Sequence, residues 1–390
     1  MKTKRLLVTI FLLALLSVIP VQELFASQPH APTAAPGWFQ INPNGFGNAQ
    51  NTTVSTLAGF GGQLYAGTIN NNGAQLWRRD VSGTWSSLIT PGFGVVRNIG
   101  IDDLFVFGGQ LYASTEADEV NGGEVYRSNN GTTWTPVVTA GFGDRNNGEV
   151  FRLTTFNSRL YASTWSYTTT HGAEIYRSST GNSGDWACVA NNGLNNDTHN
   201  EVVLSFETVN SYLYAGTRNG TTGGEVWRTI NGTNWSQVNT DGFGDANNTS
   251  VAALAAFNGY LYASTYHASG AGAQIWRCQV CDNSDWTQVV NNGYGNANTR
   301  GMNALEVLNN TLYFVVGNLT TGMEVWRTTN GTTWEQIGVG GFGDSHNIAP
   351  YWDNGVTIFN NALYIGTWNN TTGGQVWQRA NTLYLPLIIK

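Results

Sequence analysis

The sequence predicts an all-β fold of seven similar units in a row, a seven-bladed β-propeller. A Leu-Tyr pair recurs at a spacing of roughly fifty residues, which is the signature of a repeat architecture. A Gly-rich loop and an aromatic residue follow each pair, and Arg follows that aromatic residue in all units but the last. After the N-terminal residues, no segment shows the 3.6-residue apolar period of a helix. The tyrosines of the pairs are Tyr65, Tyr112, Tyr161, Tyr214, Tyr262, Tyr313 and Tyr364.

Each unit is expected to contain four short strands. The first is apolar, the second reads Leu-Tyr-Ala-Gly/Ser-Thr in its commonest form, the third holds the aromatic residue, and the fourth carries Trp and leads into Gly-Phe-Gly. β-branched and aromatic residues suit pleated strands, whereas Asn and Gly suit the tight turns between them. Four-stranded units of this length without helices are typical of propeller blades.

The two ends of the array predict how the ring closes. Seven Leu-Tyr strands are followed by only six fourth-strand tryptophans, from Trp85 to Trp334. Residues 38–41, with the Gly-Phe-Gly that comes after them, match the missing fourth strand. We therefore expect the N-terminal strand to complete the last blade, because closure removes two open ends that would otherwise expose unpaired strands.

The termini differ from the repeats. Residues 1–26 predict a signal peptide, because basic residues precede an apolar run over residues 6–19 and small residues stand near Ala26. Residues 27–36 predict a flexible leader, residues 37–381 the propeller, and residues 382–390 a C-terminal tail. The tail is either a short surface-sorting segment or a strand packed on the last blade. These patterns predict a protein that is secreted or held at the cell surface.

Composition restricts the possible partners. Charged residues make up only 11% of the chain and the net charge is −7, which disfavours a grip on phosphate backbones. We expect a monomer without cofactor, whose partner is an extracellular carbohydrate or protein and not nucleic acid. A single Cys-x-x-Cys does not supply a structural zinc site. Cys278 and Cys281 therefore form either a local disulfide, as exported proteins permit, or two buried thiols.

The turns between third and fourth strands resemble the Asp-box of sialidase-like propellers. Residues 128–134, 229–235 and 328–334 read Ser/Thr-x-Asn-Gly-Thr-x-Trp, whereas the family has Ser-x-Asp-x-Gly-x-Thr-Trp. Asn replaces the Asp, and one residue is missing. The resemblance implies a secreted bacterial propeller with degenerate boxes. Because the box is a folding device, it carries over no catalytic residue, and the sequence does not place the arginine triad or the Tyr/Glu pair that sialidases use.

A column of Glu and Gln stands two residues before the third-strand aromatics. Seven equivalent copies cannot share one reaction centre, since catalytic groups are few and asymmetric. Buried carboxylates and guanidiniums must be paired, so we expect this column to join the following arginines in a structural network between blades. The column consists of Gln75, Glu124, Glu174, Glu225, Gln274, Glu324 and Gln375.

Asymmetry within the repeats points to a binding rim. The second-to-third and fourth-to-first loops are expected on one side of the ring, around the mouth of the channel. The position just after the second strand varies although its flanks do not: Ile69, Glu116, Trp165, Arg218, Tyr266, Gly317 and Trp368. Exposed aromatic rings either stack on sugars or a peptide or pack on neighbouring loops. The predicted binding residues are Trp165, His171, His199, Arg218, Tyr266, His267, Trp352 and Trp368.

Catalysis is the alternative. Glu149, Glu201, Arg300 and Trp352 are taken as equivalent positions at the channel mouth. Two carboxylates there would suit acid/base work on a glycoside, or the mixed charges would simply neutralise one another. We favour a non-enzymatic binding module, because no motif with a demanding chemical spacing appears. A glycoside hydrolase or polysaccharide lyase that uses Glu149, Glu201 and Arg300 is the second hypothesis, and a purely structural envelope component is the third.

Overall fold

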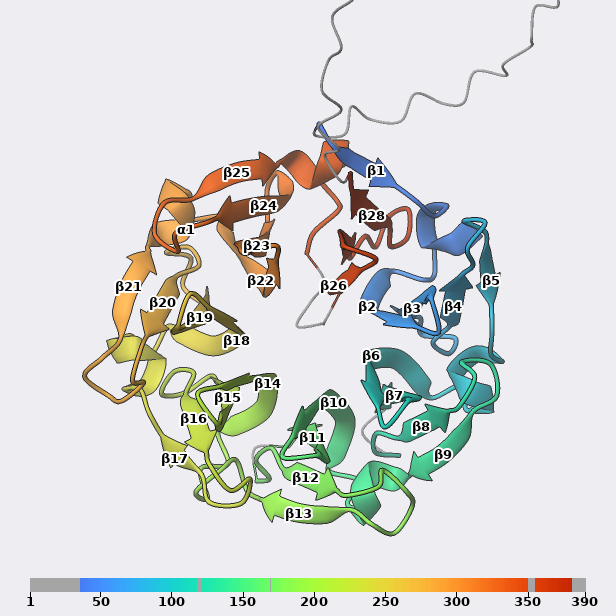
Figure 1. The fold of residues 1–390 in the computed structure, drawn as a ribbon, viewed down its shortest axis with the longest axis horizontal. Helices are drawn as coiled ribbons and strands as arrows, with labels where there is room; N and C mark the ends of the chain where they lie inside the picture. The colour runs from blue at the N-terminus through green and yellow to red at the C-terminus, as the bar shows by residue number, and fades with distance from the viewer. Residues whose placement is uncertain (1–35, 118–120, 169, 350–354, 381–390) are drawn as a thin grey trace, which may run out of the picture. The chain divides into compact units, whose positions relative to one another are not determined.

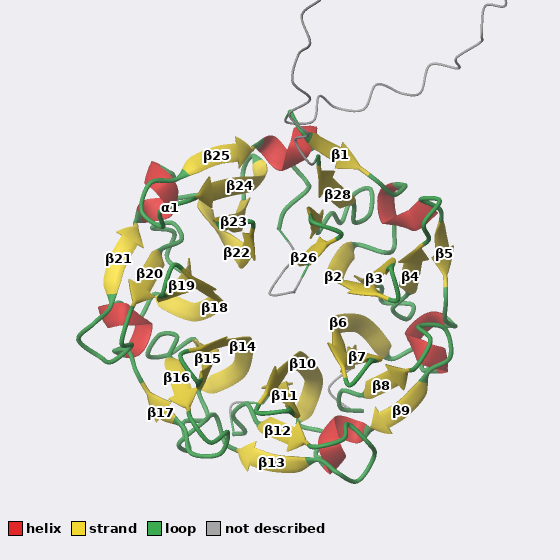
Figure 2. Ribbon diagram, in the orientation of Figure 1, coloured by secondary structure: helices red, strands yellow, loops and turns green. Residues whose placement is uncertain are grey.

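The computed structural model describes residues 36–117, 121–168, 170–349 and 355–380, and its regular structure is almost entirely β (Figures 1 and 2). The predicted signal peptide, the tail over residues 382–390, nearly all of the leader and Trp352 lie outside the described residues. No helix in the described ranges is long and apolar enough to cross a membrane. The helical segments are single turns at Asn44–Gly47, Pro91–Gly94, Ala140–Gly143, Asp241–Gly244 and Gly340–Gly343, and at α1 (Asn292–Gly295).

Antiparallel pairing arranges the strands in sets of four. The sets are β2 (Thr53–Phe60), β3 (Gln63–Ile69), β4 (Leu76–Arg79) and β5 (Trp85–Ser87); β6 (Asn98–Phe107), β7 (Gln110–Ala117), β8 (Val125–Ser128) and β9 (Thr135–Val138); β10 (Asn147–Phe156), β11 (Arg159–Ser166), β12 (Ile175–Ser178) and β13 (Ala187–Ala190); β14 (Asn200–Val209), β15 (Tyr212–Asn219), β16 (Val226–Thr229) and β17 (Ser236–Gln237); β18 (Asn248–Phe257), β19 (Tyr260–His267), β20 (Ile275–Cys278) and β21 (Thr287–Val290); β22 (Thr299–Leu308), β23 (Thr311–Asn318), β24 (Gly322–Thr328) and β25 (Glu335–Gly338); and β26 (Val356–Phe359), β27 (Ala362–Gly366) and β28 (Val376–Arg379) with β1 (Trp38–Gln40).

Two-residue turns join the first and second strands of each set. In the turn Asn258-Gly259, both residues have positive φ, 49° and 77°, and the Gly61-Gly62 and Asn309-Asn310 turns are built in the same way. A turn with two left-handed residues matches the twist of paired strands and favours Asn and Gly. The turn residues therefore set the register that brings the Leu-Tyr strand beside the first strand.

The sets follow one another around a ring. The first strands contact one another in chain order, β2 with β6 and so on to β22 with β26, and β26 also contacts β2. Figure 1 shows these first strands on the inner side and the fourth strands on the outer side. Each first strand therefore presents its residues to the centre of the ring and to the adjacent sets.

The first described strand, β1, pairs with the last described strand, β28. Gln40 lies opposite Trp377, and Trp38 lies opposite Arg379. The Trp38 ring is buried, and its indole N–H donates to the Ile337 carbonyl oxygen at 3.0 Å in the neighbouring set. This pairing joins the first and last described segments of the ring into one sheet.

Aromatic stacking explains the recurring Gly-Phe-Gly loops. Phe142 lies 3.9 Å from Tyr176, centroid to centroid and nearly parallel, and meets Trp186 edge-on. Equivalent stacks join Phe46 to Trp77 and other loops to their third strands. The Phe142 backbone has φ of 65°, a conformation that residues other than glycine rarely adopt. The half-buried stack offsets that strain in the units that contain it.

Candidate functional site

Most of the variable positions lie in the last residues of the second strands, and several of them make backbone contacts with the next set. Glu116 pairs with Glu149 of the next set, Trp165 with Val202, and Arg218 with Ser250. Within each set, the same positions pair across to the start of their own first strand. The side chains that differ from unit to unit are therefore gathered at one end of the first strands, as expected from the repeats.

Three consecutive variable side chains make one continuous surface, which we call the rim cluster: Trp165, Arg218 and Tyr266, together with Glu201. Trp165 and Tyr266 both pack against buried apolar side chains of β10 and β14. The Arg218 guanidinium carbon lies 6.0 Å from the centroid of the Trp165 ring, and Arg218 is ion-paired with Glu201. The side chains of Arg218 and Glu201 are 30% and 29% exposed, so both can be reached by a ligand.

Beside the rim cluster lies a second group, the acidic cluster, made of Asp102, Glu116, Glu149 and Tyr167. The Tyr167 hydroxyl donates to the Glu149 carboxylate, which is buried. Glycines make the room, since a Cβ at Gly100 would lie 2.7 Å from the Glu116 Oε2 and 3.1 Å from the Asp102 Oδ1.

Burial controls the protonation of the acidic cluster. Burial raises the pKa of Glu116 to about 7. Burial also raises the pKa of Tyr167 far above its usual range, with the charges of Glu149 and Glu116 adding to the effect. Tyr167 therefore stays a hydroxyl donor, and Glu116 exchanges a proton near neutral pH.

The sequence alignment of Glu149 with Glu201 was wrong by one residue. Glu149 lies opposite Trp165, and the residue opposite Arg218 is Val202. A shift of one residue turns a side chain to the other face of a strand. Glu149 therefore bonds to Tyr167 while Glu201 bonds to Arg218.

Arg300 holds the loop that follows β19. Its guanidinium donates to the Ala268 carbonyl oxygen at 3.0 Å and lies close to Gly270. Trp368 belongs to another part of the ring, where its backbone pairs with Thr53 and Ile348. Trp368 thus lies apart from the sector in which Trp165, Arg218 and Tyr266 meet, whereas Arg300 contacts the loop that follows Tyr266.

All four histidines of the loops have an aspartate partner from a fourth-to-first loop. His267 is buried, and its Nε2 lies 3.1 Å from Asp245. The shortest His–Asp nitrogen–oxygen distances of the exposed pairs are 2.8 Å for His199–Asp197 and 2.9 Å for His346–Asp344; His171 and Asp144 stand 3.7 Å apart. These pairs fix loops, and within the described residues no three His, Cys, Asp or Glu side chains gather as a metal site.

The Glu/Gln column is structural, but it acts within a set and not between sets. Glu225 accepts from the Asn200 side chain at 2.7 Å and from the Trp227 indole N–H at 2.7 Å, all within β14–β17. Asn200 also donates to the Gly193 carbonyl, so it ties the Gly-rich loop to the carboxylate. The arginines point elsewhere: Arg228, for example, donates to the carbonyls of Val280 and Cys281 in the next set.

Cys278 and Cys281 are joined in a disulfide, which closes the turn between β20 and β21. Cys188 is a free thiol on the exposed β13. In the Asp-box-like turns, the Asn130 side-chain oxygen accepts from the backbone N–H groups of Thr132 and Thr133 at 2.9 Å. Asn therefore fills the acceptor position of the turn without a charge.

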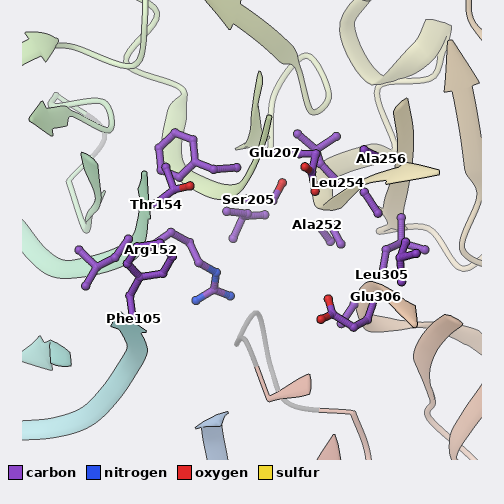
Figure 3. Close-up of a pocket in the computed structure, with 17 residues that line it drawn as sticks. Phe105, Arg152, Thr154, Ser205, Glu207, Ala252, Leu254, Ala256, Leu305 and Glu306 are labelled. Carbon is purple, nitrogen blue, oxygen red and sulfur yellow. The ribbon is translucent and has the colours of Figure 1, made fainter. Parts of the chain in front are cut away.

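Sequence reasoning missed two carboxylates inside the channel, Glu207 and Glu306. Both line a cavity of about 390 Å³ between the first strands (Figure 3). Each lies directly opposite the tyrosine of a Leu-Tyr pair, Tyr214 and Tyr313. Comparing the residues at this fixed distance from the Leu-Tyr pairs would have exposed them, because their counterparts in the other units are uncharged.

Comparisons with known proteins bear on the fold. No family model and no curated protein sequence matches the chain. Among solved structures, an ancestral GH74 enzyme matches 85% of this chain and 48% of its own, with a TM-score of 0.58 and 13% identity. A sialidase from Trypanosoma rangeli matches 88% of this chain and 59% of its own, with a TM-score of 0.52 and 13% identity. The chain has a sialidase-like β-propeller fold. It spans about half the length of these enzymes, and the likeness concerns the fold alone.

Proposed function

We propose that this protein is an exported β-propeller that binds carbohydrate on the rim cluster without transforming it. The observation that carries the proposal is the contiguity of Trp165, Arg218 and Tyr266. An aromatic face on either side of a charged pair offers stacking for sugar rings and hydrogen bonds for their hydroxyl groups. Both aromatic rings are half-buried and pack against buried side chains of β10 and β14, so little conformational entropy is lost on binding.

The proposal includes seven blades, the last completed by β1. It is supported by the pairing of Gln40 with Trp377 and by the contact of β26 with β2. Export is supported by the sequence of residues 1–26 and agrees with a disulfide between Cys278 and Cys281. A structural neighbour that is itself a sialidase makes carbohydrate a more natural ligand class than protein.

Binding to a glycan array, followed by titration of the best oligosaccharide, tests the proposal. Replacing Trp165 and Tyr266 together by Ala should weaken binding at least about tenfold, since a stacked aromatic ring contributes about 1 kcal/mol or more. Trp368→Ala is the matched control, because it removes an aromatic ring at an equivalent position outside the rim cluster. Equal affinity of the double variant and the wild type would reject the site.

Glycoside hydrolysis is the second candidate, and the acidic cluster favours it. A general acid needs a carboxyl group that is protonated near neutral pH, and the pKa of Glu116 is raised to about 7 by burial. Glu149 lies across from Glu116 and accepts from Tyr167. The hydrolase hypothesis thus rests on Glu116 and Glu149, because Glu201 is ion-paired with Arg218. Hydrolysis of aryl glycosides that is lost in Glu116→Gln, with sugar binding kept, would favour the enzyme over the binding module.

A further inference from the structure

The central channel contains a ring of seven equivalent residues, one from each set, which we call the channel ring. Each member lies directly opposite the tyrosine of its own Leu-Tyr pair. All seven line one or both of two cavities, of about 390 and 510 Å³. The members are Ala58, Phe105, Thr154, Glu207, Ala255, Glu306 and Thr357.

The charge of the channel ring lies on one side. Glu207 and Glu306 are its only ionisable members, and the small Ala255 stands between them. In Figure 3 both carboxylates lie at the edge of the cavity, with Phe105 on the other side of the space. A cation placed between the two carboxylates would be attracted by both.

Within the part of the chain that the structure describes, neither glutamate forms an ion pair. Glu207 accepts from the Thr208 backbone N–H at 2.9 Å, but no hydrogen bond or ion pair to the Glu306 carboxylate is found among the described residues. Burial, reinforced by the charge of Glu207, raises the pKa of Glu306 to about 8, and burial raises the pKa of Glu207 to about 7. The pair is thus held in a setting that opposes two negative charges.

Arg152 is the basic residue that lines the same cavity, and its guanidinium is engaged by the wall of the channel. It donates to the Phe151 carbonyl at 3.1 Å and to the Asp102 carbonyl at 3.3 Å. It also lies over the Phe151 ring, 4.2 Å from the centroid. These contacts tie the arginine to β6 and β10, and in Figure 3 its guanidinium projects into the space between Phe105 and Glu306, which belongs to β22.

The cavity is reached from the end of the channel that lies away from the rim cluster. The larger cavity shares Phe105 and Glu306 with the smaller one and extends to Gly61, Gly62 and Asn360. Gly61 and Gly62 form the turn between the first and second strands, at the opposite end of those strands from Trp165 and Arg218. A ligand held there would leave the rim cluster uncovered.

We propose that the channel binds a small organic ammonium ion, whose charged nitrogen lies between Glu207 and Glu306 and whose carbon skeleton lies toward Phe105. An amino sugar or a short diamine fits this description. A protonated amine supplies several N–H donors and relieves the repulsion between the two carboxylates, while the open volume accepts a group the size of one sugar ring. This site is independent of the rim cluster and of the function proposed for it.

Titration calorimetry with putrescine and D-glucosamine at pH 7, where both amines are mostly protonated, tests the proposal, with D-glucose as the neutral counterpart of glucosamine. Both amines should bind and glucose should not. Glu306→Gln and Glu207→Gln should each weaken amine binding about tenfold or more, because a hydrogen bond to a charged group is lost. Both variants should fold at least as well as the wild type at pH 8, since each removes a repulsive charge.

The matched control is Glu335→Gln, which neutralises an exposed carboxylate of β25 that pairs with Arg327 outside the channel. It should leave amine binding unchanged, as should Trp165→Ala. The proposal is overturned if neither amine binds when its concentration is raised to about 10 mM. A Kd above that concentration would be far weaker than the Kd of an ordinary small-ligand site. It is also overturned if glucose binds as well as glucosamine, or if the Glu335 variant loses as much affinity as the Glu306 variant. Binding of putrescine alone would identify the diamine, and binding of glucosamine alone the amino sugar.

Discussion

Replacing Gly331 by Ala should destabilise the protein strongly, because this glycine lies in the Asp-box-like turn on which the tyrosine of the preceding set rests. Gly331 has φ of +78°, and a Cβ there would come closer than 3.0 Å to the Tyr262 hydroxyl oxygen. The same turn glycine meets the same tyrosine elsewhere, as Gly232 meets Tyr161 and Gly131 meets Tyr65. This contact between the turn glycine and the tyrosine therefore recurs between neighbouring sets.

The expected loss of unfolding free energy in Gly331→Ala has two parts. A left-handed backbone costs a residue with a side chain about 1–2 kcal/mol. Forcing an extra methyl group into a packed contact costs about 1–3 kcal/mol more. The free energy of unfolding should fall by about 2–5 kcal/mol in Gly331→Ala, measured by urea denaturation followed by tryptophan fluorescence.

Gly109→Ala separates the two parts. Gly109 has φ of +77°, almost the same as Gly331, but a Cβ there would meet no atom within 4 Å. This control should therefore lose only the backbone part, about 1–2 kcal/mol. Tyr262→Phe removes the clashing oxygen, so Gly331→Ala should cost about 1–2 kcal/mol less in that background than in the wild type. If the free energy of unfolding fell equally in the Gly331 and Gly109 variants, and Tyr262→Phe did not change the effect of Gly331→Ala, the proposed contact would be refuted.

Two further predictions concern buried carboxylates. The pKa values of Glu116, Glu207 and Glu225 are raised to about 7 and that of Glu306 to about 8, from 4.5, so the folded state holds more protons than the unfolded state between these limits. The urea midpoint should therefore be highest near pH 5 and fall as the pH rises to about 8. The fall should be smaller in Glu306→Gln. A midpoint that rises over this range would contradict the raised pKa values. Asn200→Ala removes a donor to Glu225 and to the Gly193 carbonyl, and it should cost about 3 kcal/mol. The cost should be larger at pH 8 than at pH 5, because the ionised Glu225 then loses the Asn200 donor and is left with the Trp227 indole N–H. Equal costs at the two pH values would show that Glu225 does not titrate in this range.

The repeats predicted the strands because each unit uses the same residue types for the same packing contacts. Leu-Tyr, the third-strand aromatic and Gly-Phe-Gly reappear as buried contacts, so their spacing alone locates the four strands of a set. The variable position after the second strand was also accessible, because divergence within a fixed frame can be seen without coordinates. Trp165, Arg218 and Tyr266 are adjacent because their sets are adjacent.

What the sequence did not predict depends on which way a side chain turns. Glu149 stands two residues after Asn147, whereas Glu201 stands one residue after Asn200, so the two glutamates are not equivalent; the same register irregularity follows the Asn in both sets. The His–Asp pairs join the end of a second strand, or a loop, to an aspartate of a fourth-to-first loop, and repeat spacing carries no information on such contacts. Glu207 and Glu306 looked like ordinary strand residues, because only the curvature of the ring makes their sides of β14 and β22 face a shared cavity.

A crystal structure with a bound oligosaccharide tests the central claim most directly. Soaking should give density for a sugar ring that stacks on Trp165 or Tyr266, with a hydroxyl group within hydrogen-bond distance of Arg218 or Glu201. Sugar density confined to another sector of the ring, such as that around Trp368, would contradict the assignment of the rim cluster as the binding site.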